Sequence, residues 1–527
     1  VNYLGNCGPR LVLTLHEAQA VAIAHGYAKV KGKPMGVVLH ANVGLMNAVM
    51  AIFDAYADRA PMLILGATGA VDAARRRPWI EWIHTSRDQA AMVRPFVKWD
   101  DQPASVAAAL ESVLRAWLMT QASPPAPTYV CLPVEVQEDP LPSAASTLDP
   151  TRFAHFSAPA ASTEDLQAAA NLLQQARSPL ILLGRHDRSE AAWEQRIAFA
   201  EAIGAAVLCD QKCGVGFPSD HPCFVAAPAQ YLDARALAAL NQADLVLSLD
   251  WPDVAGTLAQ RADQARDVPA ILASPDERLH NGWSFDHFPL PAARVRARVT
   301  PETFLSGLMP MFSPKRRAPW FRAEKPAFDI PSAGPITLAA LARAFEDARG
   351  ARPVCLTRLP FGWPDALTRF GHPLDCIGYD GGGGIGSTPG ITVGAAMALK
   401  GAGRLPVAIL GDGDLLMGSQ ALWTAAHERT PALFIVNNNC SFFNDVEHQE
   451  RVARRRGRPV ERRTIGMSID DPPVDLVALA RSYGLTAMGP VLKIEDLAEA
   501  LADAFAAAEA GEIVLLDVSV PPPPPAH

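Results

Sequence analysis

The chain has few aromatic residues and no long apolar run. Aromatic residues make up 7% of the sequence, and no apolar stretch approaches the roughly 20 residues that a membrane-spanning helix needs. The first residues contain neither a basic n-region nor an initiator Met, so we expect no signal peptide and an incomplete N-terminus. These absences predict a protein that does not interact with membranes.

An excess of positive charge is also lacking. The formal net charge is -8, so the chain as a whole lacks the excess positive charge that is typical of nucleic-acid-binding proteins. Arginines concentrate only in residues 451–463, where the pattern fits either a solvated loop or a mobile segment near an anionic substrate or cofactor. The 8 cysteines are scattered without zinc spacing, and even Cys209 and Cys213 lack a matching pair. We therefore expect core thiols in a reducing cytoplasm.

Helical and strand patterns alternate along most of the chain, and 527 residues are enough for about three domains. Such alternation predicts parallel sheets covered by helices. The fold class we expect is α/β, with three doubly wound, mainly parallel domains at residues 1–150, 164–313 and 334–520. The main expected strands are 36–39, 62–65, 128–132, 179–183, 205–208, 244–249, 270–273, 353–356, 407–410, 432–436 and 513–518, and the main expected helices are 17–31, 47–57, 106–117 and 419–427.

The strongest functional pattern lies in the third predicted domain. The strand at 407–410 ends in Gly411-Asp412-Gly413-Asp414, and the strand at 432–436 ends in three asparagines that include Asn439. Ligands of doubly wound sheets gather at the carboxyl ends of the strands. Carboxylate and amide oxygens suit Mg²⁺, which completes its coordination with phosphate oxygens, and the glycines allow the backbone to approach a diphosphate closely.

This spacing resembles the diphosphate-binding motif of thiamine-diphosphate-dependent enzymes. The residues between the two halves, Ala421 to Ala426 and Pro431, resemble the benzoylformate decarboxylase and acetolactate synthase group. The resemblance implies that Mg²⁺ is bound by Asp412, by the Asn439 side chain and by the Ser441 backbone carbonyl. It also implies that the residues in contact with thiamine diphosphate include Gly411, Asp412, Gly413, Asp414, Asn439, Ser441 and Phe442, although Asp414 replaces a serine or alanine that is frequent in the family. FAD is not expected.

A glycine run at 381–386 satisfies Gly-x-Gly-x-x-Gly, a weak dinucleotide pattern. No acidic residue is convincingly placed for a ribose, so a nicotinamide oxidoreductase is an alternative with little support. The family resemblance implies another role, in which the Gly383 carbonyl contacts the aminopyrimidine and Ile385 separates the two rings of the bent cofactor. A tight turn without function is the remaining interpretation.

The first predicted domain contains His16-Glu17-Ala18 at the start of a helix, in a run similar to the family's pyrimidine-binding domain. The resemblance implies that Glu17 hydrogen-bonds the pyrimidine ring nitrogen and promotes formation of the C2 ylid; a helix-start glutamate that favours the macrodipole is the alternative. His40 ends a predicted strand, as a substrate-facing histidine does in benzoylformate decarboxylase. We interpret it as a proton-transfer or substrate-orienting group, with a structural histidine as the alternative.

The substrate pocket is less well defined. His84, Phe442 and Phe443 are candidates for its wall, and the arginine-rich segment 451–463 is a candidate lid. Benzoylformate decarboxylase takes a second pocket histidine from its central domain, where this chain has Trp251-Pro252-Asp253. The exact aromatic substrate therefore does not carry over.

We accordingly expect a thiamine-diphosphate- and Mg²⁺-dependent, non-oxidative 2-oxo acid decarboxylase that works through a C2 ylid and an enamine. The alternatives are a carboligase or lyase similar to acetolactate synthase or benzaldehyde lyase and, more remotely, a non-catalytic thiamine diphosphate binder. An oxalyl-CoA decarboxylase-like role is weaker, because the central domain offers no obvious basic nucleotide cradle. The family solution implies a homodimer or homotetramer with the site between subunits.

Overall fold

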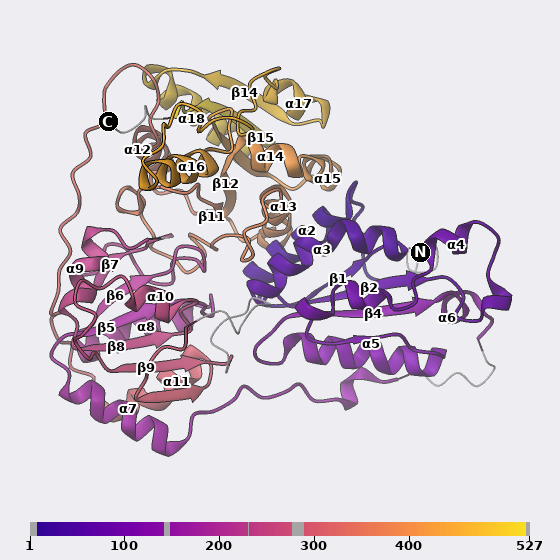
Figure 1. Cartoon of the computed structure of the whole chain (residues 1–527), viewed down its shortest axis with the longest axis horizontal. Coiled ribbons are helices and arrows are strands. Elements are labelled where there is room, and N and C mark those ends of the chain that lie inside the picture. Colours follow the sequence, from indigo (N-terminus) through magenta and orange to yellow (C-terminus); the bar gives the residue numbers. More distant parts are fainter. Residues whose placement is uncertain (1–7, 142–147, 230, 277–288, 523–527) are drawn as a thin grey trace. The chain divides into compact units, whose positions relative to one another are not determined.

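The computed structural model describes residues 8–141, 148–229, 231–276 and 289–522. The chain divides into two compact units (Figure 1). The first unit holds residues 1–27, 330–361 and 384–527, and the second holds residues 28–329 and 362–383. Helix α2 (Glu17–Lys31) runs from the first unit into the second.

The second unit contains two separate parallel sheets. The first has the strand order β1-β2-β4-β3, and its long central strands are almost wholly buried. Ser105 caps α5 by accepting a hydrogen bond from the Ala108 N–H at 3.2 Å. The elements of this sheet are β1 (Met35–Val38), α3 (Ala41–Ala57), β2 (Met62–Thr68), α4 (Ile80–His84), β3 (Asp100–Asp101), α5 (Val106–Gln121), β4 (Pro127–Pro133) and α6 (Val134–Glu138).

The second sheet of this unit has the order β10-β9-β8-β5-β6-β7, with every neighbouring pair parallel. All five residues of β5 are buried, as the continuous apolar run predicts for a strand covered on both faces. The elements are α7 (Thr163–Gln175), β5 (Pro179–Leu183), α8 (Glu190–Ile203), β6 (Ala206–Cys209), β7 (Phe224–Ala226), α9 (Ala234–Gln242), β8 (Leu245–Leu249), α10 (Val254–Leu258), β9 (Ala270–Ser274), β10 (Val295–Arg298) and α11 (Pro301–Leu308).

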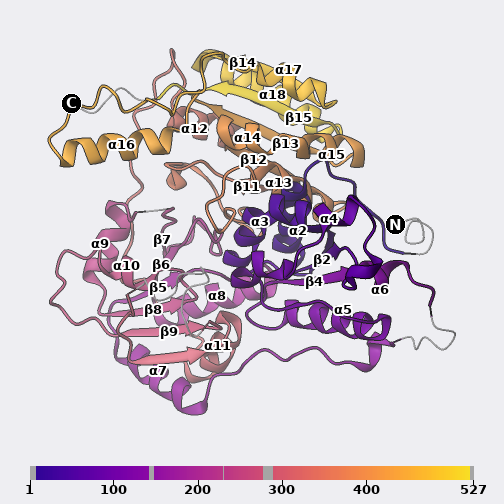
Figure 2. The ribbon, with the colours of Figure 1, turned by 45° about the vertical axis from the view of Figure 1, so that its right-hand side comes forward.

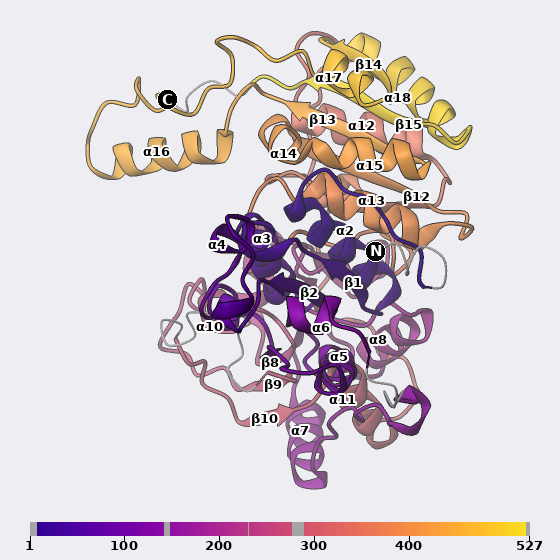
Figure 3. The ribbon, with the colours of Figure 1, turned by 90° about the vertical axis from the view of Figure 1, so that its right-hand side faces the viewer.

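The first unit is built on a five-stranded parallel sheet of order β11-β12-β13-β15-β14. Helices cover both of its faces, with α18 on one side and α13 and α15 on the other (Figure 3). Its elements are α12 (Leu338–Arg349), β11 (Val354–Arg358), α13 (Thr388–Leu399), β12 (Leu405–Gly411), α14 (Asp412–Gly418), α15 (Gln420–Glu428), β13 (Ala432–Asn438), α16 (Phe443–Arg455), α17 (Leu476–Ser482), β14 (Thr486–Val491), α18 (Ile494–Glu509) and β15 (Ile513–Ser519).

These three sheets confirm the predicted α/β class with mainly parallel strands, whereas the domain boundaries stay a prediction. Strand β14 was not predicted, because Gly489-Pro490 interrupts its pattern and proline is restricted to edge positions such as this one. The interpretation of residues 451–463 as a loop is wrong at its start, because α16 extends to Arg455. Figure 2 shows α16 extending away from the sheet of the first unit.

Helices α2 and α13 cross at van der Waals distance within the first unit. A Cβ atom on Gly26 would lie 1.9 Å from the Ile391 carbonyl oxygen, and one on Gly394 would lie 1.9 Å from the Ile23 carbonyl oxygen. Since neither backbone oxygen can move like a side chain, only glycine fits at these two positions. The two glycines fix the start of α2, and therefore Glu17, against the helix that follows the glycine-rich run.

The expectation of core thiols is also confirmed. None of the seven cysteines in the described ranges forms a disulfide, and six of them are buried, with Cys440 partly exposed. None of the helices in the described ranges is long and apolar enough to cross a bilayer.

Candidate active site

Two neighbouring strands of the first unit deliver the predicted metal ligands. Strand β12 pairs in parallel with β13 so that Gly411 lies opposite Asn437. Asp412 follows directly as the first residue of α14, and Asn439 follows the end of β13. The structure thus places the two polar strand ends side by side at the carboxyl edge of the sheet.

The loop after β13 is folded back onto Asp412. The Ser441 N–H donates to Asp412 Oδ2 at 3.1 Å, and the Ile469 N–H donates to the Cys440 carbonyl at 2.7 Å. Cys440 adopts a positive φ of 51°, which is a strained conformation for a residue with a side chain. The strain turns the chain so that Asn439 and Ser441 face the same carboxylate.

Three oxygens of this cluster are buried and make no hydrogen bond within the protein. They are Asp412 Oδ1, Asn439 Oδ1 and Ser441 Oγ. Burial also raises the pKa of the Asp412 carboxyl to about 6, because the charged form is poorly solvated there. Buried oxygens without partners are rare and costly. A hard cation would satisfy them and would favour the carboxylate.

Asn438 has a different role from its neighbour. Its Nδ2 donates to Asp517 Oδ1 at 3.0 Å and its Oδ1 accepts from the Cys440 N–H at 3.1 Å. Asn438 therefore braces the loop, while Asn439 Oδ1 is left for a ligand. Among the residues described there is no group of three His, Cys, Asp or Glu that could hold a metal, so a site here needs amide, hydroxyl or carbonyl oxygens.

Asp414 supports the glycine-rich run. Its Oδ1 accepts from the Gly386 N–H at 2.7 Å, its Oδ2 accepts from the Thr388 hydroxyl at 2.6 Å, and Arg358 Nε lies 3.9 Å from Oδ2. The two buried carboxylates of the Gly-Asp-Gly-Asp run therefore differ: Asp414 has its oxygens in use, and Asp412 has one oxygen without a partner. The family resemblance separates them, because it assigns only Asp412 to the metal, but it does not predict the contact of Asp414 with Thr388. Thr388 next to Pro389 is a helix-start signal that could have drawn attention to this contact.

The glycine run at 381–386 does not follow a strand directly, as a dinucleotide-binding loop does. The strand that precedes it, β11, ends at Arg358, and α13 begins only at Thr388, whereas the dinucleotide fingerprint follows a strand directly. Gly383 has φ +82° with open space where a Cβ would stand, and the Ile385 side chain is 38% exposed. Both features leave room for a ligand beside the run.

Glu17 is the first residue of α2 and is half-buried. Two residues further along α2, Gln19 Nε2 donates to the Gly386 carbonyl at 2.8 Å. Gln19 was not predicted as a site residue. It joins the helix that carries Glu17 to the same glycine run that Asp414 holds.

The predicted pocket aromatics lie in the first unit. Phe442 packs on Gly413, where an added Cβ would lie 2.6 Å from its ring, and half-buried Phe443 begins α16. Further along, Glu450 accepts from Arg454 Nε at 2.8 Å and forms an ion pair with Arg463. The arginine-rich segment thus begins within α16, and two of its arginines pair with Glu450, the residue directly before it.

His40 and His84 lie together in the second unit. His40 is the N-cap residue of α3 and makes no side-chain capping bond, and His84 ends α4. Their ring centroids are 5.1 Å apart. The structure therefore brings together two residues that the sequence pattern proposed separately.

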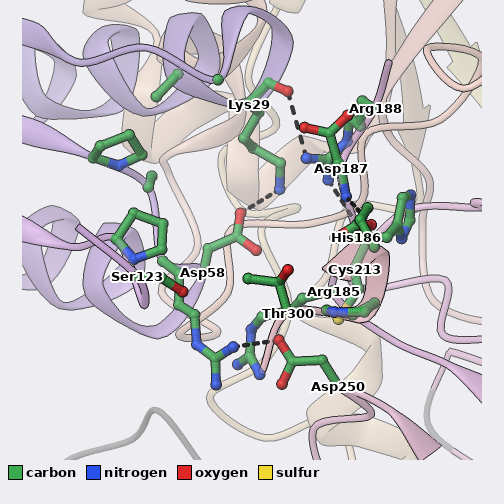
Figure 4. A pocket seen from close by; sticks show the side chains of 18 of the residues that line it. Lys29, Asp58, Ser123, Arg185, His186, Asp187, Arg188, Cys213, Asp250 and Thr300 are labelled. Atoms are coloured by element: carbon green, nitrogen blue, oxygen red, sulfur yellow. Dashed lines mark hydrogen bonds and ion pairs between the residues drawn. The ribbon is translucent and has the colours of Figure 1, made fainter. Parts of the chain in front are cut away.

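A cavity of about 460 Å³ lies elsewhere in the second unit, at the carboxyl ends of β5 and β8 (Figure 4). Lys29 pairs with Asp58, and Arg59 with Asp250. Arg185 and Arg188 line it as well. None of the predicted site residues contributes to it.

Comparison with known proteins finds one enzyme family in three successive segments of the chain. The thiamine pyrophosphate enzyme models match in order: the N-terminal TPP binding domain at residues 1–92, the central domain at 166–268, and the C-terminal TPP binding domain at 361–518. The chain belongs to the thiamine-diphosphate-dependent enzymes.

Individual members of this enzyme family align over most of the chain. Benzoylformate decarboxylase of Pseudomonas aeruginosa is 25% identical, covering 94% of this chain and 90% of its own. A probable 2-ketoarginine decarboxylase, AruI, of the same organism is 29% identical, covering 92% and 84%. The structure of a thiamine diphosphate-dependent 4-hydroxybenzoylformate decarboxylase of Rhodococcus jostii superposes with a TM-score of 0.79 at 21% identity, covering 98% of this chain and 93% of that one. The last comparison shows the shared fold.

Replacing Asp414 tests whether its carboxylate supports the glycine-rich run while the carboxylate of Asp412 is left for a ligand. Asp414→Ala leaves the Gly386 N–H and the Thr388 hydroxyl without an acceptor, so we expect a stability loss of about 1–3 kcal/mol and faster hydrogen exchange in residues 383–388. Asp412→Ala is the matched control, and we expect a smaller loss because it removes only the hydrogen bond from the Ser441 N–H to Oδ2, while Oδ1 has no partner to lose. Equal melting temperatures for Asp414→Ala and wild type would contradict this assignment.

Proposed function

We propose that the protein is a thiamine-diphosphate- and Mg²⁺-dependent decarboxylase of a 2-oxo acid. The observation that carries the proposal is the pair of unpartnered buried oxygens Asp412 Oδ1 and Asn439 Oδ1, in a chain of this enzyme family. Asp412 and Asn439 would bind Mg²⁺ through their Oδ1 atoms and Ser441 through its carbonyl. Gly411, Gly413, Asp414 and Phe442 would surround the diphosphate, with Gly383 and Ile385 beside the rings.

The cofactor, when bound, supplies a carbon nucleophile for the 2-oxo group and takes up the electron pair released with CO₂. The protein's contribution is binding, orientation and proton transfer. Glu17 would hydrogen-bond the pyrimidine ring nitrogen through its carboxyl group. His40 orients the substrate or moves a proton at its imidazole. Phe443 lines the apolar side of the pocket.

The substrate class is tested with purified protein, thiamine diphosphate and Mg²⁺. Benzoylformate, pyruvate and 2-ketoarginine are offered separately, and CO₂, aldehyde and acyloin are all measured. We expect CO₂ and the aldehyde in equal amounts from at least one of these acids. Acyloin as the main product would instead establish a carboligase of the acetolactate synthase or benzaldehyde lyase type, and cofactor binding without any turnover would establish a binder.

We also propose a homodimer or homotetramer with the active site between subunits. Helices α3 and α4 expose a set of large apolar side chains, which we call the apolar face: Val43, Met46, Met50, Trp82 and Ile83. Met46 is 52% and Trp82 80% exposed. Exposed apolar groups that cluster in this way mark interfaces, and the two histidines lie at the ends of the same two helices.

Light scattering tests the assembly. We expect wild type to be at least a dimer, and Met46→Glu to shift it toward the monomer with loss of turnover, because a charge on the apolar face opposes burial. Leu110→Glu, a change at a 40% exposed residue of α5 outside this face, is the matched control and should leave assembly unchanged. A fully active monomer would contradict the proposal.

A further inference from the structure

The cavity of the second unit lies where the six-stranded sheet of that unit changes its winding direction. In the order β10-β9-β8-β5-β6-β7, the chain winds outward from β5 on one side and from β8 on the other. The pair β5 and β8 is therefore the topological switch point, at whose carboxyl ends doubly wound sheets bind ligands. The loops that follow these two strands line the cavity through Arg185 and Asp250 (Figure 4).

The crevice between these two loops is closed by the backbone. The Gly184 N–H donates to the Leu249 carbonyl at 2.9 Å, and the Arg185 N–H donates to the Asp250 carbonyl at 3.0 Å. The helix that follows, α8, begins with Glu190, whose charge disfavours a phosphate at that helix end. A dinucleotide needs an open loop and a helix end for its phosphates. An anion in this cavity therefore has to be bound by side chains.

Two ion pairs form part of the cavity wall. Lys29 pairs with Asp58 and Arg59 with Asp250, and these four side chains are at most 7% exposed. Each buried charge is compensated by its partner, so a pair adds no net charge to the cavity. These four groups shape the wall and leave the binding of an anion to other side chains.

Arg185 and Arg188 supply positive charge that is not compensated in this way. Arg185 Nη2 donates to the Ala57 carbonyl at 2.8 Å, while its Nε and Nη1 are buried without a hydrogen-bond partner. Arg188 donates to three backbone carbonyls, and its buried Nε has no partner. Ser123 Oγ, also in the wall, is likewise buried and unpartnered. Burial removes the hydration of a cation and favours an anion beside it.

The other charged groups of the wall leave this surplus in place. Glu302 lies 3.4 Å from Arg196 Nη1, and its Oε1 accepts from the Asp187 N–H at 2.9 Å. Asp187 and Lys31 are both exposed and opposite in charge. Two uncompensated guanidinium groups match a phosphate group, which carries about two negative charges near neutral pH. The volume of about 460 Å³ has room for a phosphate and a small organic group.

The same wall holds the segment that leads into the glycine run. Lys29 Nζ donates to the Tyr379 carbonyl as well as to its carboxylate partner. Arg188 Nη2 donates to the Ile377 carbonyl at 3.1 Å. An anion that fixes the Arg188 guanidinium therefore also fixes the backbone of residues 377–381. Such a contact couples occupation of the cavity to the glycine run.

We propose that the cavity is a regulatory site for a phosphate group, either free phosphate or a small phosphomonoester, whose binding orders the segment before the glycine run. Arg185 and Arg188 bind the phosphate oxygens through their unpartnered N–H groups, and Ser123 donates its hydroxyl. The site shares no residue with the proposed decarboxylase site. Its existence does not depend on which reaction the protein catalyses.

Calorimetry on the cofactor-loaded protein, with Mg²⁺ in excess, tests the site. The bound cofactor occupies the diphosphate site, so that added phosphate cannot bind there. Inorganic phosphate and glycerol 3-phosphate are titrated separately into wild type, Arg185→Met and Arg185→Lys. Methionine removes the charge of Arg185, and lysine keeps it. Arg152→Met, at an exposed residue outside the cavity, is the matched control. Hydrogen exchange of residues 377–383 is followed with and without each compound.

We expect phosphate to bind wild type and Arg152→Met equally and to slow hydrogen exchange in residues 377–383. Arg185→Met should raise the Kd by about 10- to 100-fold, the ratio for a lost hydrogen bond to a charged group, and should abolish the slowing. Arg185→Lys should recover part of the affinity. Tighter binding of glycerol 3-phosphate than of phosphate would identify a phosphomonoester as the ligand, and the reverse order would identify free phosphate.

Three results would overturn the proposal. They are no binding of either compound to wild type, a wild-type Kd in Arg185→Met, and binding that leaves hydrogen exchange of residues 377–383 unchanged. The melting temperature of the ligand-free variant shows whether Arg185→Met is folded. If it is not, Ser123→Ala replaces it, because that change removes only the hydroxyl, and an unchanged Kd there contradicts the site equally. None of these readouts requires turnover, so they stand apart from the test of the proposed function.

Discussion

The parallel pairing of β12 with β13 is the constraint on which the site depends. It sets Gly411 opposite Asn437, so that Asp412 and the loop after β13 leave the sheet together. A slip of one residue would move that loop by about 3.3 Å along the strand and would break the Ser441 to Asp412 hydrogen bond. The Asn438 to Asp517 bond connects β13 to its other neighbour, β15, and holds the same register from the opposite side.

This arrangement leaves polar atoms buried at a cost in stability. Asp412 Oδ1, Asn439 Oδ1 and Ser441 Oγ have no partner, while Asp414, two residues from Asp412, has a donor for each oxygen. A chain selected only for stability would satisfy or remove such atoms. Their concentration at one edge of one sheet is what separates a ligand site from an ordinary strand end.

The parts of the fold and site that follow from local pattern were predictable. Continuous apolar strands such as β5 and β13, and the carboxyl-end position of Asp412 and Asn439, follow from periodicity and from the rule for parallel sheets. Contacts between distant segments were not predictable. The bond from Gln19 to Gly386, the bracing by Asn438 and the His40–His84 pair depend on tertiary packing, which no local spacing encodes. Strand β14 was missed because its proline contradicts the local rule and only its edge position permits it.

The affinity for thiamine diphosphate with and without Mg²⁺, measured by calorimetry on Asn439→Ala and Asn438→Ala, tests the central claim most directly. If the unpartnered Asn439 oxygen binds the cation, Asn439→Ala weakens Mg²⁺-dependent cofactor binding by at least about 10-fold and keeps the melting temperature of the ligand-free protein. Asn438→Ala lowers that melting temperature and changes binding less. Wild-type affinity and wild-type Mg²⁺ dependence in Asn439→Ala would contradict the claim.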